Sequence, residues 1–182
     1  PVIILDRRIL GDKYTCFIGA DNKRIGQAAG KWIAEKLSAT SKNKIVELKG
    51  LMTTTPGQDR HSGFLKGMGD FDADVIFEAD MKWLEPYARK EMESCLARVE
   101  QIDLVYAHND PGAHGAYLAA KAMGREKDII FVGIDGLPQE GQMYVKQGIL
   151  SVSFQYPTGG KESIDFALKL LNGETVDKEI VL

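Results

Sequence analysis

Short apolar segments alternate with longer amphipathic segments along the whole chain. The short segments are rich in β-branched residues, as buried strands are, and the longer ones repeat their apolar positions with a helical period. Strands are expected at Val2–Leu5, Tyr14–Gly19, Lys44–Lys49, Asp74–Ala79, Leu104–Ala107, Ile129–Gly133, Leu150–Phe154 and Glu179–Leu182. Helices are expected at Asn22–Leu37, Pro56–Met68, Leu84–Val99, Pro111–Met123, Pro138–Gln147 and Gly159–Leu171. This alternation predicts an α/β fold with a mostly parallel sheet and helices on both faces.

Capping and turn residues support these boundaries. The segment Thr55-Pro56-Gly57-Gln58 has the form of a capping box with proline at the first helical position. Asp110-Pro111 repeats the acidic cap and the proline, so Asp110 is expected to cap a helix rather than to contact a ligand. Gly124 and Gly148 lie where a helix should end.

Polar residues lie just after four of the expected strands. Asp6-Arg7 follows the first strand, Asn109 and Asp135 follow two strands of the middle of the chain, and Gln155 follows a fourth. Ligands of open parallel sheets bind outside the carboxyl ends of the strands, so we expect these side chains to share one cleft. A helix start and a loop add an arginine and a tryptophan. The candidate ligand-binding residues are Asp6, Arg7, Arg60, Trp83, Asn109, Asp135 and Gln155.

These residue types suit a ligand crowded with neighbouring hydroxyl groups. Carboxylates, amides and guanidinium groups offer paired donors or acceptors, and an aromatic ring offers an apolar face to the carbons of a sugar ring. Structural alternatives exist for each: Asp135 before Gly136 suits a turn, and Asp6-Arg7 suits a local ion pair. Asn109 and Gln155 would equally satisfy loop backbone groups. The recurrence of polar residues after four separate strands favours ligand binding.

Catalytic chemistry has less support in the sequence. The three histidines share no metal-ligand spacing, and neither a Gly-x-Ser-x-Gly elbow nor a glycine-rich nucleotide loop is present. Asp6, Asp110 and Asp135 would be the carboxylates of a glycoside hydrolase, but the additional arginine and asparagine residues favour recognition. We therefore expect a binding protein with no catalytic residue, cofactor or metal.

Composition and charge narrow the class further. The 182 residues contain 23 Lys+Arg and 26 Asp+Glu, which gives a formal net charge of -3 and no basic excess that would suit a nucleic acid. No apolar run approaches the ~20 residues of a membrane helix. Cys16 and Cys95 are too few for a disulfide scaffold and are expected to be buried small apolar residues.

Several short segments occur together in a specific order. Asp6-Arg7 is followed by Ala20-Asp21-Asn22 and then by Arg60-His61-Ser62-Gly63-Phe64. The series continues with Ala107-His108-Asn109-Asp110, Val132-Gly133-Ile134-Asp135-Gly136 and Phe154-Gln155-Tyr156-Pro157. With this series the chain resembles the type I periplasmic sugar-binding proteins, most closely the ribose-binding branch, over essentially its full length. The resemblance implies two Rossmann-like lobes joined by three crossing strands, with the sugar between them.

The resemblance also implies a role for each candidate residue. Trp83 takes the place of the aromatic residue that stacks on the sugar, with Met81 as the alternative if the preceding loop shifts the register. The residues implied to bind sugar hydroxyls are Asp6 and Arg7 of the first lobe and Arg60, Asn109, Asp135 and Gln155 of the second.

The same comparison divides the chain into three parts. Residues 1–20 are implied to be the trailing part of the N-terminal lobe, 21–155 the complete C-terminal lobe, and 156–182 the return segment of the N-terminal lobe. Because the chain opens within an apolar strand, we expect it to be a processed or truncated piece of a longer protein. The first half of the N-terminal lobe is then an expected partner segment, and we expect this chain alone to bind sugar weakly or not at all.

The implied function is capture of a monosaccharide, a ribose-like pentose or a hexose, for delivery to a membrane ABC importer. The implied location is the periplasm or another extracytoplasmic space. Two alternatives stay open: a sensor domain that signals to a membrane kinase, and the effector domain of a lactose-repressor-type regulator. Nucleic acid is not an expected partner of this chain.

Overall fold

The computed structural model describes residues 1–182, and its elements follow the predicted alternation of strands and helices. The strands are β1 (Ile3–Leu5), β2 (Cys16–Gly19), β3 (Lys44–Lys49), β4 (Asp74–Asp80), β5 (Leu104–Ala107), β6 (Ile130–Asp135), β7 (Val152–Gln155) and β8 (Glu179–Val181). The helices are α1 (Asn22–Ser38), α2 (Thr55–Met68), α3 (Glu85–Leu96), α4 (Asp110–Ala122), α5 (Gly141–Lys146) and α6 (Gly160–Leu171). Helix α5 is shorter than predicted because residues 138–140 form a turn before it.

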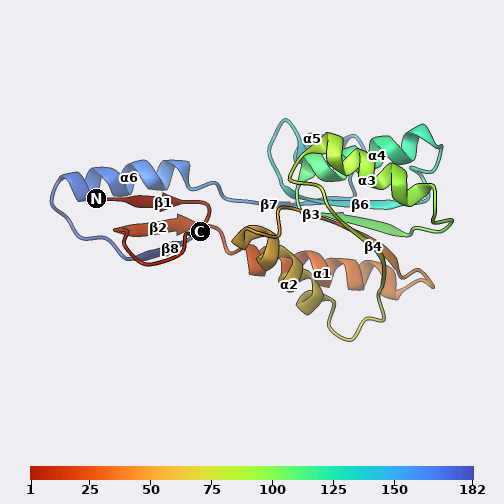
Figure 1. Ribbon diagram of the computed structural model, residues 1–182, viewed down its shortest axis with the longest axis horizontal. Coiled ribbons are helices and arrows are strands. Elements are labelled where there is room, and N and C mark those ends of the chain that lie inside the picture. Colours follow the sequence, from red (N-terminus) through yellow and green to blue (C-terminus); the bar gives the residue numbers. More distant parts are fainter.

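The middle of the chain forms a five-stranded sheet with the strand order β4-β3-β5-β6-β7. All its pairings are parallel. Helices α1 and α2 cover one face of this sheet, and α3, α4 and α5 cover the other (Figure 1). The predicted α/β fold with a parallel sheet and helices on both faces is therefore confirmed. The strands all run the same way, so their carboxyl ends meet at one edge.

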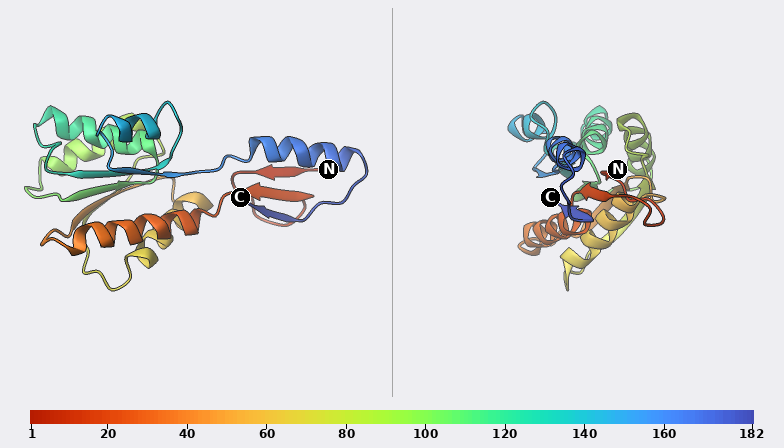
Figure 2. Two further views of the ribbon diagram at one scale, coloured as in Figure 1. Left: turned by 180° about the vertical axis from the view of Figure 1, so that it is seen from behind. Right: turned by 90° about the vertical axis from the view of Figure 1, so that its left-hand side faces the viewer.

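The two ends of the chain come together in a second, smaller sheet with the strand order β1-β2-β8, also parallel. Helix α6 lies alongside it, and both termini lie in this smaller body (Figures 1 and 2). The molecule is elongated because the smaller body extends from the edge of the larger one. Two passages of chain connect the bodies, one between β2 and α1 and the other at residues 156–159, between β7 and α6.

Two apolar cores lie on the two faces of the five-stranded sheet. The core beneath α3 and α4 includes Leu48, Met92 and Val105, each of them fully buried. The core beneath α1 and α2 includes Phe64 and Tyr106, whose rings stack with centroids 4.6 Å apart. Burial on both faces explains why the central strands are almost continuously apolar. Cys16 and Cys95 are buried free thiols, as predicted.

Helices α1 and α2 approach each other closely, and this contact sets the position of Arg60. A Cβ on Gly26 of α1 would lie 2.3 Å from the carbonyl oxygen of Arg60, well inside contact distance. Glycine at this position lets the backbones meet. Arg60 therefore projects from a rigid helix pair rather than from a loop.

The predicted capping box at the start of α2 is wrong. The helix begins at Thr55, so the capping position falls on Thr54, whose side chain makes no capping hydrogen bond. Gln58 Nε2 instead donates to the Met52 carbonyl of the preceding loop at 2.9 Å. Thr55 lies one residue too far into the helix to act as the cap.

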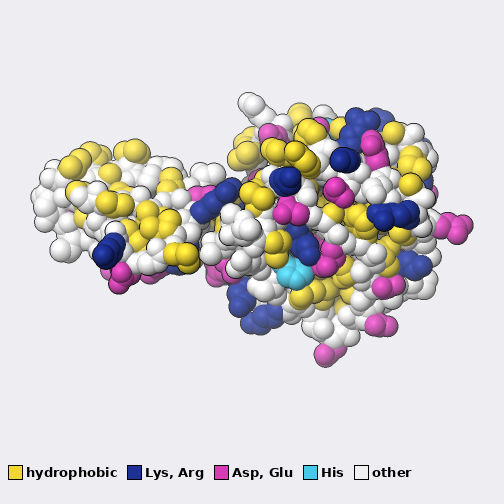
Figure 3. Space-filling model, viewed as in Figure 1, with side chains coloured by type: hydrophobic (Ala, Val, Ile, Leu, Met, Phe, Trp, Pro, Cys, Tyr) yellow, Lys and Arg dark blue, Asp and Glu magenta, His cyan; other side chains and the backbone are white.

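The smaller body leaves apolar side chains in contact with solvent. Helix α6 has no buried residue, and its Ile164, Leu168 and Leu171 are all exposed, Leu171 at 74%. Hydrophobic side chains also gather over the smaller body on the face drawn in Figure 3. None of the helices has the length and apolar character that crossing a bilayer requires.

Candidate functional site

A polar cavity of about 190 Å³ lies at the carboxyl ends of the five-stranded sheet, where the smaller body meets the larger one. Both bodies and several elements contribute to its wall. The residues that line it are Asp6, Arg7, Pro56, Arg60, Trp83, Asn109, Asp135 and Tyr156. Six of the seven candidate residues therefore meet in one place, as the position of polar residues after parallel strands had indicated.

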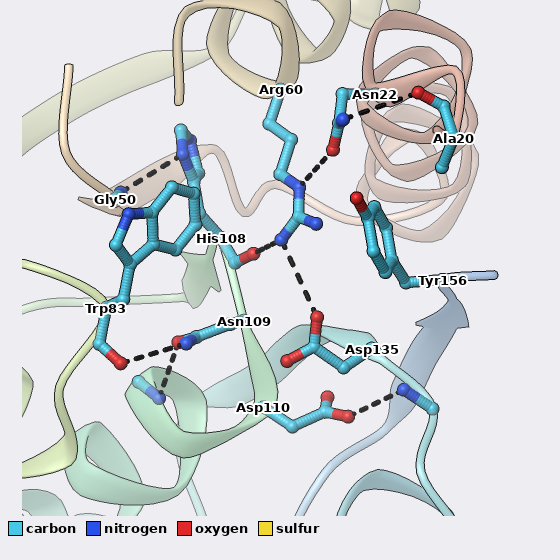
Figure 4. A network of polar contacts seen from close by, with 12 residues as sticks. Ala20, Asn22, Gly50, Arg60, Trp83, His108, Asn109, Asp110, Asp135 and Tyr156 are labelled. Carbon is cyan, nitrogen blue, oxygen red and sulfur yellow. Dashed lines mark hydrogen bonds and ion pairs between the residues drawn. The ribbon is translucent and has the colours of Figure 1, made fainter. Parts of the chain in front are cut away.

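The guanidinium of Arg60 is the best-connected group of this cavity. Its Nε donates to Oδ1 of Asn22 at 2.8 Å, and its Nη1 donates to the carbonyl of His108. The same Nη1 lies 3.7 Å from Oδ1 of Asp135 (Figure 4). Arg60 is only 4% exposed. A buried arginine needs such partners, because an unpaired buried charge is strongly destabilising.

A buried carboxylate supports this network from behind. Glu47 is fully buried in β3, and its Oε1 accepts from Nε2 of His108 at 2.9 Å. The Gly50 N–H donates to Nδ1 of His108 at 3.2 Å, so the proton of this imidazole resides on Nε2. Glu47 also accepts from Nδ1 of His61, 2.9 Å from its Oε2. Burial opposes ionisation, but the hydrogen bonds from His108 and His61 lower the pKa of Glu47 to about 2.

Asp135 ends β6 in an unusual conformation and environment. Its φ of 129° lies where residues other than glycine are rarely found, and such strain concentrates at functional sites. Burial raises the pKa of the Asp135 carboxyl to about 7, although the Arg60 guanidinium opposes the rise. A new hydrogen-bond donor that enters the cavity would stabilise the ionised form of this carboxyl group.

The prediction that Asp110 caps α4 is wrong. Asn109 is the cap, and its Oδ1 accepts from the Gly112 N–H at 2.9 Å. Asp110 is instead the first residue of the helix and is fully buried. Its Oδ2 accepts from the Gly136 N–H and from the Ser153 hydroxyl, both at 2.8 Å. Asp110 thus holds the turn after β6 and does not line the cavity.

Trp83 forms the aromatic wall of the cavity. Lys82 and Trp83 have φ values of 53° and 65°, which turn the chain sharply after β4. Nδ2 of Asn109 donates to the Trp83 carbonyl at 3.0 Å and fixes the turn. A Cβ on Gly50 would lie 2.2 Å from the Trp83 ring, so glycine leaves room for the indole. Met81, the alternative stacking residue, is fully buried in a core and does not line the cavity.

The smaller body brings Asp6 and Arg7 to the same cavity. Oδ1 of Asp6 accepts a hydrogen bond from the Tyr156 hydroxyl, and its Oδ2 lies 3.5 Å from Nε of Arg7. The Arg7 guanidinium carbon lies 6.0 Å from the centre of the Trp83 ring, and that of Arg60 lies 5.3 Å from it. The local Asp6–Arg7 ion pair occurs, but both partners are half exposed, so it contributes little stability.

Gln155 is the one candidate residue that the structure does not bring to the cavity. It is exposed and borders another hollow of about 260 Å³, together with Asp21 and Arg24. Neighbouring residues of an extended chain point in opposite directions, so Tyr156 lines the cavity instead. Sequence reasoning missed Tyr156 and Pro56. The only signal for Tyr156 was its place beside Gln155 at a strand end.

One group of side chains would also be compatible with a metal ion. Glu47, His61 and Glu78 can each offer one ligand atom, and these atoms lie within 4.8 Å of one another. Their capacity is already used, because Glu47 accepts from two histidines and the Lys49 ammonium lies 3.2 Å from Glu78. These contacts satisfy the group without an ion.

The side chains collected in the cavity suit the recognition of a polar ligand. The guanidinium groups donate hydrogen bonds, the carboxylates accept them, and the indole offers an apolar face. Of the three carboxyl groups that a hydrolysis would have used, Asp6 and Asp135 line the cavity, whereas Asp110 is held outside it by Gly136 and Ser153.

A family model described as the periplasmic binding protein domain matches residues 1–175 of the chain. Among curated proteins, the ribose import binding protein of Salmonella typhimurium is 32% identical over 178 residues, which are 97% of this chain and 59% of that protein. The chain thus spans about three fifths of the length of such relatives.

Two solved structures are similar over the whole chain. The fructose binding periplasmic domain of a hybrid two component system is 47% identical with a TM-score of 0.95, and the match covers 100% of this chain and 61% of that one. A Mycobacterium smegmatis protein in complex with β-D-fucofuranose is 30% identical with a TM-score of 0.92, covering 100% of this chain and 62% of that one.

Proposed function

The chain belongs to the periplasmic binding protein domain family, and from this membership we propose that it binds a monosaccharide in the cavity at the sheet ends and releases it unchanged. The observation that carries the proposal is the cavity wall. It combines guanidinium and carboxylate groups from both bodies with the indole face of Trp83. A sugar presents neighbouring hydroxyls and an apolar ring face, which this wall complements.

Each side chain has a proposed part in recognition. Arg60 donates to a sugar hydroxyl while it stays bound to its protein partners, and Asp135 accepts from a hydroxyl next to it. From the smaller body, Asp6 accepts a hydrogen bond from a sugar hydroxyl and Arg7 donates one. Trp83 packs against the sugar ring. Asn109 lends its remaining donor. Gln155 borders the other hollow, and sugar titration of Gln155→Ala tests whether it contributes to binding.

The proposed mechanism is capture by closure. The cavity lies between two bodies joined by two passages of chain, so a ligand that contacts both bodies favours the arrangement in which they are close. The ligand can shift this equilibrium only as far as its contacts are better in the closed state. Polar groups in the cavity left without a partner cost about 1–3 kcal/mol each, which provides specificity for hydroxylated ligands.

We propose that residues 1–20 and 156–182 belong to one lobe and residues 21–155 to the other. The exposed apolar side chains of α6 and of the smaller sheet suit a further segment of the first lobe as a partner. The full site would then include that segment, and the chain without it would bind sugar weakly or not at all.

Two destinations follow from the similarities, both in the periplasm or another extracytoplasmic space. Delivery to a membrane ABC importer is supported by the ribose import binding protein at 32% identity. Signalling to a membrane kinase is supported by the fructose binding domain of a hybrid two component system at 47% identity. The higher identity favours the sensor, and fructose is the first ligand to test.

The test is a thermal-shift screen of the full-length protein with fructose, ribose, allose, galactose and myo-inositol. We expect at least one of them to raise the melting temperature, and calorimetry should give one site per chain. Titration of Asp135→Asn and Gln155→Ala with the bound sugar then shows whether each side chain contributes to binding. Product analysis after incubation checks whether the sugar is converted. Absence of binding to every sugar, or conversion of a bound one, would overturn the proposal.

A further inference from the structure

Tyr156 touches three of the proposed sugar-binding residues, each in a different way. Its backbone N–H donates to the Asp135 carbonyl at 3.0 Å, and its ring centre lies 4.9 Å from the Arg60 guanidinium carbon. Its hydroxyl donates to Oδ1 of Asp6. Asp135 ends β6, Arg60 lies in α2 and Asp6 follows β1, so Tyr156 connects groups from both bodies. Figure 4 shows Tyr156 beside Arg60 and Asp135.

The hydroxyl contact aims the Asp6 carboxylate. Asp6 has a φ of 73°, in the left-handed region, and its backbone N–H donates to the Ile18 carbonyl at 2.9 Å. Its backbone is therefore anchored in the smaller sheet, while its half-exposed side chain contacts Tyr156 and Arg7. The bond from Tyr156 directs this carboxylate towards the larger body.

The Tyr156 hydroxyl also has capacity left for a ligand. Burial, followed by the contact with Asp6, raises the pKa of Tyr156 to about 12, so the phenol stays protonated at neutral pH. Its single proton goes to Asp6, and although the Asn22 amide also approaches its oxygen, a lone pair remains able to accept. Because Tyr156 lines the cavity, a ligand hydroxyl placed there can donate to it.

We propose that Tyr156 is a further residue of the sugar site, which positions the Asp6 carboxylate in the cavity that Arg60 also lines and accepts a hydrogen bond from a sugar hydroxyl. The inference rests on the proposed function in that the ligand is a monosaccharide. Closure would then depend on the Tyr156–Asp6 hydrogen bond, which already joins the two bodies.

If Tyr156 served only to fill space, Tyr156→Phe would leave sugar binding unchanged. Tyr156 packs at the margin of the core beneath α1 and α2, and phenylalanine would fill that space equally well. It would also keep the ring against Arg60. Tyr156→Phe therefore removes the oxygen and little else, and its effect should depend on whether Asp6 still carries a carboxylate.

The experiment is a double-mutant cycle in the full-length protein with Tyr156→Phe, Asp6→Asn and both together, titrated with fructose and with ribose. We expect Tyr156→Phe to weaken binding about tenfold or more, and to have a much smaller effect when Asp6→Asn is already present. Tyr14→Phe is the matched control, because it removes a tyrosine–carboxylate bond to Glu179, 3.2 Å long, outside the cavity. Its sugar affinity should be unchanged.

The same cycle without sugar, measured as the free energy of unfolding, separates the two possible failures. If the wild type binds sugar and Tyr156→Phe binds it equally well, the inference is overturned and the proposed function stands. If the wild type binds none of the five sugars of the thermal-shift screen, the proposed function fails. Additive effects of Tyr156→Phe and Asp6→Asn on unfolding would then overturn the Tyr156–Asp6 contact as well, whereas coupled effects would support it.

Discussion

Nη1 of Arg60 lies 3.7 Å from Oδ1 of Asp135, and the two side chains are 5% and 25% exposed. Arg60 is held by Asn22 and His108 as well, so its guanidinium is in place before any ligand arrives. A ligand that meets fixed groups loses less free energy in ordering them. The cavity is in this sense preorganised on the larger body, and the smaller body adds Asp6 and Arg7 to it.

Arg60→Met should weaken both sugar binding and the fold. The substitution leaves the His108 carbonyl and Oδ1 of Asn22 without their donor and Asp135 without its ion-pair partner, which costs about 1–3 kcal/mol of unfolding free energy. The substitution also removes the proposed donor to a sugar hydroxyl, at a similar cost in binding free energy. Because about 1.4 kcal/mol corresponds to a factor of ten, sugar affinity should fall by roughly one to two orders of magnitude. Calorimetry and urea unfolding measure the two effects. Arg89→Met, an exposed arginine paired with Glu93, is the control and should change neither.

Asp135 should make the fold less stable as the pH rises. The pKa of its carboxyl is about 7 in the folded protein, against an ordinary value of 3.8. Between these values the folded state binds more protons than the unfolded state, so the free energy of unfolding falls with rising pH, on the order of 2–4 kcal/mol. Above the folded value this dependence levels off. Asp110, whose pKa burial raises to about 6, adds a smaller contribution of the same sign.

The measurement is urea unfolding at about pH 4.5 and about pH 8 for the wild type and for Asp135→Asn. The variant should lose less stability between the two pH values, since an amide has no proton to release. Asp70→Asn, at an exposed position, is the control. An unchanged pH dependence in Asp135→Asn would contradict the prediction.

Glu47→Gln should change the titration of His61. The hydrogen bond to Glu47 raises the pKa of His61 above its ordinary 6.5, although burial opposes the rise. The pair therefore stabilises the fold fully below pH 6.5, and this contribution is lost as the pH rises through the higher folded value. In Glu47→Gln the His61 pKa, followed by NMR, should return towards 6.5.

The same variant should also weaken sugar binding, because Glu47 holds His108, whose carbonyl accepts from Arg60. Glu85→Gln removes the partner of His114, 2.7 Å away on the surface, and leaves the His61 titration unaltered. An unshifted His61 pKa in Glu47→Gln would show that the carboxylate does not control it.

Gly50→Ala should displace the Trp83 ring. The added Cβ would lie 2.2 Å from ring atoms, and neither the indole nor the backbone can absorb such an overlap without moving. Only two tryptophans are present, so the emission of Trp83 can be followed by fluorescence in a Trp32→Phe background. We expect a shifted emission maximum and weaker sugar binding. Gly160→Ala, where a Cβ meets open space, is the control and should leave both unchanged.

Local regularities were sufficient to predict the elements and their order. Each of the expected strands and helices is present, because the period of the apolar positions is a property of neighbouring residues. Parallel pairing follows from the strand–helix alternation, and it places Asn109 and Asp135 at one edge of the five-stranded sheet, whereas Asp6 and Arg7 reach the same cavity from the smaller sheet. The wrong capping box at Thr55 and the wrong cap at Asp110 are displacements of one residue, which a pattern of residue types does not resolve.

The amino-acid pattern is therefore enough to establish a parallel α/β protein, the strand ends at which its polar residues gather, and the family that it resembles. Contacts between distant segments are what place Tyr156 rather than Gln155 in the cavity. They also bury Glu47 beneath two histidines and turn Asp110 towards Gly136. These arrangements depend on the orientation and desolvation of side chains from separate elements, and both quantities arise only once the chain has folded around them.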